Sequence, residues 1–189
     1  QSGQEVQATS LVFTPNTPPP VGGWPIVVWA HGTTGVVDAC APSKAVLADS
    51  TKDLISKLLA AGYVVVAPDY EGLGTPGIHP FLNIKSEAFS ITDAVVAARN
   101  YLSQRNLLTS KKWLTVGHSQ GGHAALGAAQ YASRAQLDYK GTVAVAPASN
   151  LGGILVDGEV QVANAPIDIK IATYAQLDTY TALVTAGIR

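Results

Sequence analysis

The chain has 189 residues, a formal net charge of −1, 47% apolar residues and 13% charged residues. These values indicate one globular domain, or part of a larger one, and exclude disordered and fibrous proteins. With a near-neutral charge and no long basic run, nothing points to nucleic acid as a partner. The longest apolar runs, such as 26–30 and 63–67, are too short to span a bilayer, so we expect no transmembrane segment.

The sequence has no methionine and one cysteine, Cys40. Because the first residue, Gln1, is then not a translational start, we expect it to follow a removed leader, with a secreted or periplasmic location. A shortened polypeptide is the alternative. A lone cysteine forms no internal disulfide, and in an exported protein it indicates a partner thiol on another segment or chain.

The predicted elements alternate between strands and helices. After a weakly alternating stretch and the turn-rich linker TPNTPPP, apolar runs predict buried strands at 24–31, 63–70, 112–118 and 141–149. Helices are predicted at 43–61, at 86–105 with Ser86 as its cap, and at 119–132, which is rich in small residues. This order predicts an α/β fold with a mostly parallel sheet covered by helices on both faces. Residues 150–170 look irregular, and a last helix is predicted from Ile171 to Arg189.

A Gly-x-Ser-x-Gly motif spans 117–121, with Ser119 at its centre. It falls between a predicted strand and a predicted helix, which is the context that a nucleophile elbow requires. The serine occupies a strained turn, so its neighbours two positions away must lack bulk. This turn predicts Ser119 as a nucleophile and the Gln120 N–H as an oxyanion donor. A chance Gly-Ser-Gly turn is the alternative.

Two histidines flank this serine, but neither is expected to be its general base. His118 precedes the nucleophile and should point away from the place where a base must lie. His123 lies one turn into the predicted helix, behind the elbow. We expect both to be packed or hydrogen-bonded side chains.

The second oxyanion donor is expected in the loop HGTTG, residues 31–35, which follows the first strong strand. Acyl transfer needs two preorganised N–H donors, and losing one costs about 100- to 1000-fold in rate. The backbone N–H of Thr33 is the candidate, while His31 is expected to brace the loop by hydrogen bonding.

A second glycine motif, at 72–77, fits the dinucleotide pattern Gly-x-Gly-x-x-Gly and also follows a strand. Pro76 and Pro80 prevent its third glycine from opening a helix, so nucleotide binding is disfavoured. We expect this loop to border the substrate pocket, with His79 and Phe81 as wall residues. The histidines do not pair at ligand spacing, so no metal site is predicted.

Four ordered segments carry a family resemblance: WAHGTTGVVDACAPS, VVVAPDYEGLGTPGIHPFL, GHSQGGHAAL and APASNL. Together they resemble the secretory lipase family of bacteria and fungi, of the Candida antarctica lipase A type, within the α/β-hydrolase superfamily. The resemblance implies carboxylic ester hydrolysis by a secreted protein without a cofactor, with Ser119 as nucleophile and Thr33 and Gln120 as oxyanion donors. It also implies a core at 1–149 and the beginning of a helical cap at 150–189.

The family places its acid and its histidine after the cap, in members about twice this length. The only histidine after Ser119 in this chain is His123, so the acidic residues that follow have no later histidine as a partner: Asp138, Asp157, Asp168 and Asp178. A Ser-Lys dyad with Lys140 or Lys170 is conceivable but has no supporting motif. We therefore expect the chain to be the N-terminal part of a larger enzyme, cut after Arg189. A second polypeptide would then complete the sheet and triad, with Cys40 in an interchain disulfide.

The interpretation is a serine esterase or lipase that forms an acyl-enzyme on Ser119. A peptidase or an acyltransferase on the same fold is an alternative, because a fold does not fix the acyl acceptor. A non-catalytic binding module with an α/β-hydrolase-like fold is another.

Overall fold

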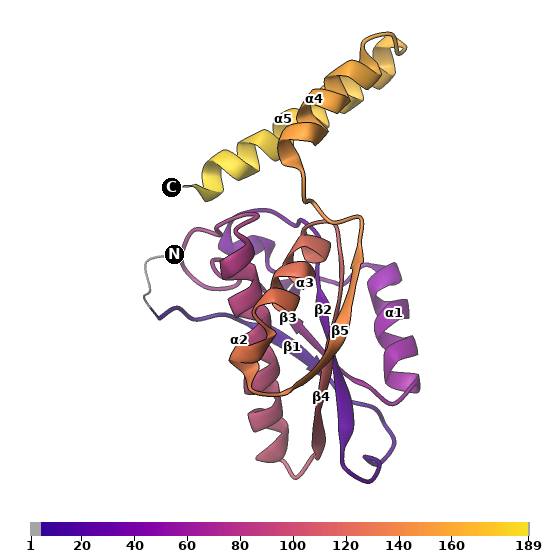
Figure 1. Ribbon diagram of the computed structural model, residues 1–189, viewed down its shortest axis with the longest axis vertical. Coiled ribbons are helices and arrows are strands. Elements are labelled where there is room, and N and C mark those ends of the chain that lie inside the picture. Colours follow the sequence, from indigo (N-terminus) through magenta and orange to yellow (C-terminus); the bar gives the residue numbers. More distant parts are fainter. Residues whose placement is uncertain (1–4, 189) are drawn as a thin grey trace.

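The protein is built on a five-stranded sheet with helices on both faces (Figure 1). The structure, a computed structural model, describes residues 5–188, so Gln1 and Arg189, with the expected leader and the expected cut, lie outside the described residues. The strands are β1 (Ser10–Phe13), β2 (Trp24–Ala30), β3 (Val64–Pro68), β4 (Thr109–His118) and β5 (Asp138–Val145). Their order is β1-β3-β2-β4-β5, and only β1 runs antiparallel to its neighbour. The predicted mostly parallel α/β fold is confirmed.

Helices α2 (Ile84–Ser103) and α3 (Gln120–Gln130) cover one face of the sheet, while α1 (Asp49–Ala60) lies on the other (Figure 1). The main core lies under α2 and α3. There, alternate residues of β2 and β3 meet an apolar stripe on α2 that consists of Ile91, Val95, Ala98 and Leu102. Small residues along α3 let this helix approach both α2 and the strands closely.

The face on the α1 side becomes more exposed toward β5. Register places Val65, Val27, Val116 and Val143 on this face across successive strands. Val27 is 1% exposed, whereas Val143 and Val145 are 52% and 49% exposed. The sheet therefore presents apolar surface at β5, which is an edge strand of the sheet described here.

After β5 the chain forms a helical hairpin, α4 (Leu151–Val162) and α5 (Ile167–Gly187), which projects away from the sheet (Figure 1). The two helices pack on each other where Gly158 meets the side chain of Leu177. Several large apolar side chains of the hairpin remain exposed: Ile154, Val156, Val160, Ile167, Ile169 and Ile171. The end of α5 returns to the core, because Gly187 packs against the backbone of Phe81. Among the helices of residues 5–188, none has the length and apolar content that crossing a bilayer requires.

Two helix starts differ from the sequence prediction. Residues 43–61 are not one helix, because two 3-10 turns, η1 (Asp38–Cys40) and η2 (Pro42–Lys44), precede an α1 that begins at Asp49. Ser86 is not the cap of α2. The helix begins at Ile84, and the side chain of Asn83 accepts a hydrogen bond from the Ser86 backbone N–H at 3.0 Å. Asparagine is as good a cap as serine, and an earlier cap adds two residues to the helix.

The end of the core also differs from the prediction. The last strand spans Asp138–Val145 rather than 141–149, and residues 150–170, predicted to be irregular, contain α4 and the start of α5. Residues 151–162 are apolar on nearly all sides and contain three glycines, so they lack the alternation of apolar and polar residues that predicts an amphipathic helix. Asn150 caps α4 by accepting from the Gly153 N–H.

The packing of α3 can be tested with two glycine-to-alanine substitutions. A Cβ on Gly127 would lie 2.6 Å from Ile84 Cγ1 and 2.9 Å from the Ile84 carbonyl oxygen, whereas nothing lies within 4 Å at Gly152 in α4. We expect Gly127→Ala to lower the free energy of unfolding by about 1–3 kcal/mol through overpacking. The control, Gly152→Ala, should leave it unchanged or raise it by up to about 1 kcal/mol through helix propensity. Urea unfolding checks both, and equal effects would contradict the packing described here.

Candidate active site

Ser119 lies in a strained turn between β4 and α3. Its backbone has φ 57° and ψ −121°, a conformation that residues with a side chain rarely adopt. The segment at the end of β5 holds this turn, because the Ser119 N–H donates to the Val145 carbonyl oxygen at 2.9 Å and the Ala148 N–H donates to the Ser119 oxygen at 3.3 Å. The turn thus has the geometry that a nucleophile elbow needs.

The glycines of the motif are required by close backbone approach. A Cβ on Gly117 would collide with the carbonyl oxygen of Gly121, and a Cβ on Gly121 would collide with that of Ala30 at the end of β2. The first turn of α3 is therefore pressed against two strand ends. This contact sets the position of Ser119 relative to the loop after β2.

The HGTTG loop lies against the elbow. An ideal Cβ on Gly32 would be 3.8 Å from Ser119 Cβ and 3.4 Å from the His118 carbonyl oxygen. The next residue, Thr33, is half-buried. The fold therefore brings the two segments of the predicted oxyanion hole together, while the roles of the Thr33 and Gln120 N–H groups stay predictions.

His31 braces this loop from below. Its Nδ1–H donates to the Gly32 carbonyl oxygen at 2.7 Å, and its ring stacks on Tyr70 at 4.3 Å between centroids. Tyr70 in turn donates its hydroxyl proton to the His31 carbonyl oxygen at 2.9 Å. Burial lowers the pKa of His31 from 6.5 to about 4, so the ring is neutral at neutral pH. Burial, with a smaller contribution from the nearby Glu87, raises the pKa of Tyr70 well above its ordinary value.

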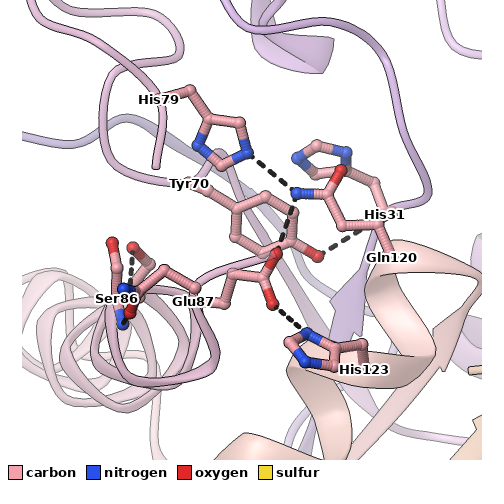
Figure 2. Close-up of polar contacts among 9 residues, drawn as sticks. His31, Tyr70, His79, Ser86, Glu87, Gln120 and His123 are labelled. Carbon is pink, nitrogen blue, oxygen red and sulfur yellow. Dashed lines mark hydrogen bonds and ion pairs between the residues drawn. The ribbon is translucent and has the colours of Figure 1, made fainter. Parts of the chain in front are cut away.

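The side chain of Gln120 is buried beneath the elbow, where His79 and Glu87 approach its amide from two sides (Figure 2). Gln120 Nε2 lies 2.8 Å from His79 Nε2 and 2.9 Å from Glu87 Oε1. His79 donates its Nδ1–H to the Glu71 carbonyl oxygen at 2.8 Å, so its Nε2 accepts from Gln120. Burial lowers the pKa of His79, although its bond to Glu71 opposes that effect. Both amide hydrogens of Gln120 are therefore bound.

Neither of the two histidines that flank Ser119 in sequence is hydrogen-bonded to its hydroxyl in the part of the chain that the structure describes. His123 directs Nδ1 at Glu87 Oε2, 2.7 Å away on the α2 side of α3 (Figure 2). His118 is exposed at the end of β4. Within residues 5–188, no hydrogen bond joins a histidine ring to the hydroxyl of Ser119.

Glu87 is the residue of this site that sequence reasoning missed. It is 0% exposed on α2, and its two oxygens take hydrogen bonds from Gln120 and His123. The sequence does contain a signal. Glu87 lies four residues before Ile91 and eight before Val95, so a charged residue occupies the apolar stripe of a core helix.

A cavity of about 630 Å³ lies between the core loops and α5. Its walls come from the loop after HGTTG, from the glycine-rich loop and from one face of α5: Val36, Val37, Ile78, Thr181, Ala182 and Thr185. The predicted wall residues His79 and Phe81 are buried and do not line this cavity, although Ile78, next to His79, does; their role as pocket walls stays a prediction. Cys40, half-buried in η1, has its sulfur beside Gly35 of the HGTTG loop, and its disulfide stays a prediction.

The neutral state of His31 predicts how stability depends on pH. Because its pKa in the fold lies below 6.5, the unfolded chain binds a proton between pH 6.5 and 4 that the folded chain does not. The free energy of unfolding should therefore fall as the pH drops through this window, with His31 contributing about 3 kcal/mol and His79 adding in the same direction. Denaturant unfolding of wild type and His31→Gln across this range measures the difference. Equal pH slopes would contradict the assignment.

Comparisons with known proteins bear on this site. The model of the secretory lipase family matches residues 39–167, which is more than half of the chain. Among solved structures, the rice cell wall degrading esterase LipA from Xanthomonas oryzae is 24% identical, with a TM-score of 0.65 over 89% of this chain and 48% of its own. Candida antarctica lipase A in its closed state is 24% identical, with a TM-score of 0.56 over 71% of this chain and 32% of its own. No curated protein sequence matches the chain significantly.

A third solved structure, that of Est1E from Butyrivibrio proteoclasticus with bound ferulic acid, is 22% identical, with a TM-score of 0.50 over 80% of this chain and 53% of its own. At these identities the structural matches establish the fold alone. The chain spans about half the length of the LipA structure that it matches. With the family match over residues 39–167 and the shared α/β-hydrolase fold, the chain belongs to the secretory lipase family.

Proposed function

We propose that this chain carries the nucleophile of a serine carboxylic ester hydrolase, an esterase or lipase, with Ser119 forming the acyl-enzyme. The observation that carries the proposal is the positive φ of Ser119 in a turn beside Gly32. Such a turn stores strain, and strain of this kind is found where function requires it. A module that only binds a ligand has no need of it.

The reaction would proceed by two acyl-transfer steps. Ser119 Oγ attacks the ester carbonyl carbon while a histidine outside these residues takes its proton. The backbone N–H groups of Gln120 and Thr33 hold the oxygen on which negative charge develops, and the alcohol leaves. Water then attacks the acyl-enzyme and releases the acid. No cofactor takes part in this scheme.

The substrate's acyl group would bind between the core, residues 1–149, and the beginning of a cap, residues 150–189. Support comes from the cavity under α5, whose lining is mostly apolar and begins three residues beyond Thr33. His79 and Phe81 would support this pocket from within the core, since both are buried and lie in the same loop as the lining residue Ile78. A mostly apolar pocket suits the acyl group of a carboxylic ester.

The acid and histidine of the triad would come from residues beyond these 189, in a C-terminal segment or a second chain. Three observations support this: the chain spans about half the length of LipA, no described histidine is hydrogen-bonded to Ser119, and Val143 and Val145 expose apolar surface at β5. An unpaired edge with an apolar face favours a further strand. Cys40 would join the two parts by a disulfide, and membership of a secretory family supports a secreted or periplasmic enzyme.

Ser119→Ala tests the nucleophile. A fluorophosphonate should modify Ser119 in the complete wild-type enzyme, including the part that supplies the acid and histidine, and the substitution should abolish labelling and lower ester hydrolysis by about 1000-fold or more. Ser149→Ala, at an exposed serine in the segment after β5, is the control and should leave both unchanged. Absence of labelling in the wild type would favour a non-catalytic binding module. Turnover of amides in preference to esters would favour a peptidase, and transfer to alcohols or amines an acyltransferase.

Intact mass tests whether a C-terminal segment or a second chain supplies the acid and the histidine. Under non-reducing conditions the active enzyme should have a mass well above 19.5 kDa, as one longer polypeptide or as two linked chains. If Cys40 forms the link, reduction should separate the chains and Cys40→Ser should prevent their covalent association. A lone 19.5 kDa species with full esterase activity would contradict the proposal.

A further inference from the structure

The buried carboxylate of Glu87 has a feature that core packing does not require. Both of its hydrogen-bond donors, Gln120 and His123, belong to the first turn of α3, immediately after Ser119. They are three residues apart, so they lie on one face of the helix. A single side chain on α2 therefore fixes two points of the turn that carries the candidate oxyanion donor.

Burying the carboxyl group of Glu87 costs the fold free energy. The carboxyl group of Glu87, at 0% exposure, loses its hydration, and an apolar residue would suit the stripe that it shares with Ile91 and Val95. Removing Glu87 would also destabilise the protein, because Gln120 and His123 would each lose a buried hydrogen-bond acceptor. We therefore look for the benefit of a buried glutamate in the two residues that its hydrogen bonds hold, Gln120 and His123.

The contacts fix the orientation of Gln120. One amide hydrogen is bound by Glu87 and the other by His79, whose ring is itself fixed by the Glu71 carbonyl oxygen. With its side chain held at both hydrogens, Gln120 cannot rotate without breaking two buried bonds (Figure 2). The backbone N–H of Gln120 belongs to the same first turn of α3, which Glu87 holds at both Gln120 and His123. An oxyanion donor works only when it is preorganised.

On the basis of the proposed function, we infer that Glu87 is a positioning residue for the oxyanion hole. It acts through the side chain of Gln120 and through His123, and it has no contact with substrate. Its role is to accept two hydrogen bonds from the first turn of α3 and so to hold the Gln120 N–H toward the developing oxyanion. His79 provides the second support of the same amide.

Two substitutions at Glu87 separate this role from a general effect on stability. Glu87→Gln keeps the shape, and its amide can accept from Gln120 and donate to the other ring tautomer of His123. Glu87→Leu suits the apolar stripe but leaves both donors without an acceptor. The matched control is Ile91→Val, one turn along the same stripe, which should cost about 0.5–1.5 kcal/mol without touching the elbow.

The measurement is the rate at which Ser119 of the complete enzyme is phosphorylated by a phosphate triester and by its thiono (P=S) analogue. Sulfur accepts hydrogen bonds poorly, so the ratio of the oxygen rate to the sulfur rate reports on the oxyanion hole. We expect Glu87→Leu to lower this ratio by about tenfold or more. Glu87→Gln should remain within about threefold of wild type, and Ile91→Val should leave the ratio unchanged although it lowers the melting temperature.

An unchanged ratio in Glu87→Leu would overturn the inference, as would an equal fall in Ile91→Val. If Glu87→Leu fails to fold, Gln120→Met keeps the backbone N–H and the side-chain length but removes the amide. It should lower the ratio in the same way, and an unchanged ratio there would overturn the inference. Failure of the proposed function is distinct, because the wild-type enzyme would then not be modified at Ser119 at all.

Discussion

The structure depends on the close approach of three chain segments at Ser119. The end of β2, the first turn of α3 and the end of β5 meet there, and the contacts leave no room for a Cβ at Gly117 or Gly121. Hydrogen bonds from the end of β5 hold the serine at a positive φ. A strained residue persists only when its surroundings over-determine it, and here they do so from both sides. The position of the HGTTG loop follows from the same contact, because Gly32 lies directly against the elbow.

The two faces of the sheet differ in how completely they are covered and in where their polar groups lie. Under α2 and α3 the core is closed, and it contains the polar groups that fix Gln120 and the HGTTG loop. His31, Tyr70 and His79 stack in a row between the two loops, and burial keeps both imidazoles neutral at neutral pH. The face on the α1 side is closed at β3 and open at β5. The part of the core that holds Ser119 is therefore closely packed, whereas the neighbouring strand β5, whose end also contacts Ser119, has an exposed apolar face.

Much of this architecture could be predicted from the sequence because its signals are local. Apolar β-branched runs identify β2 and β3, and the Gly-x-Ser-x-Gly motif between a strand and a helix identifies the turn at Ser119. Helix starts were less predictable, since Asn83 and Ser86 are both good caps and only the backbone decides between them. Helix α4 was missed because an apolar segment with three glycines has no polar face to reveal its period.

The polar network around Gln120 could not be predicted, because it joins α3 to α2 and to the loop before α2, and Gln120 lies 33 residues after Glu87 in the sequence. Glu87 alone carries a local signal, as a charge on an apolar stripe, but its partners are set by how α2 packs on α3. His118 and His123 are close to Ser119 in sequence, but this closeness does not predict whether their rings contact its hydroxyl.

The hairpin of α4 and α5 contacts the loop that supports the side chain of Gln120. The end of α5 touches the core at the backbone of Phe81, with an ideal Cβ on Gly187 only 3.2 Å from the His79 carbonyl oxygen. The ring of this same His79 holds one amide hydrogen of Gln120. A shift of α5 relative to the core would change the packing on residues 79–81, and His79 directly contacts Gln120, the residue next to Ser119. In a fold whose interior is close-packed, a displacement of this kind is transmitted rather than absorbed. Helix α5, which forms one wall of the cavity, therefore also contacts the loop of His79, and His79 holds the side chain of Gln120.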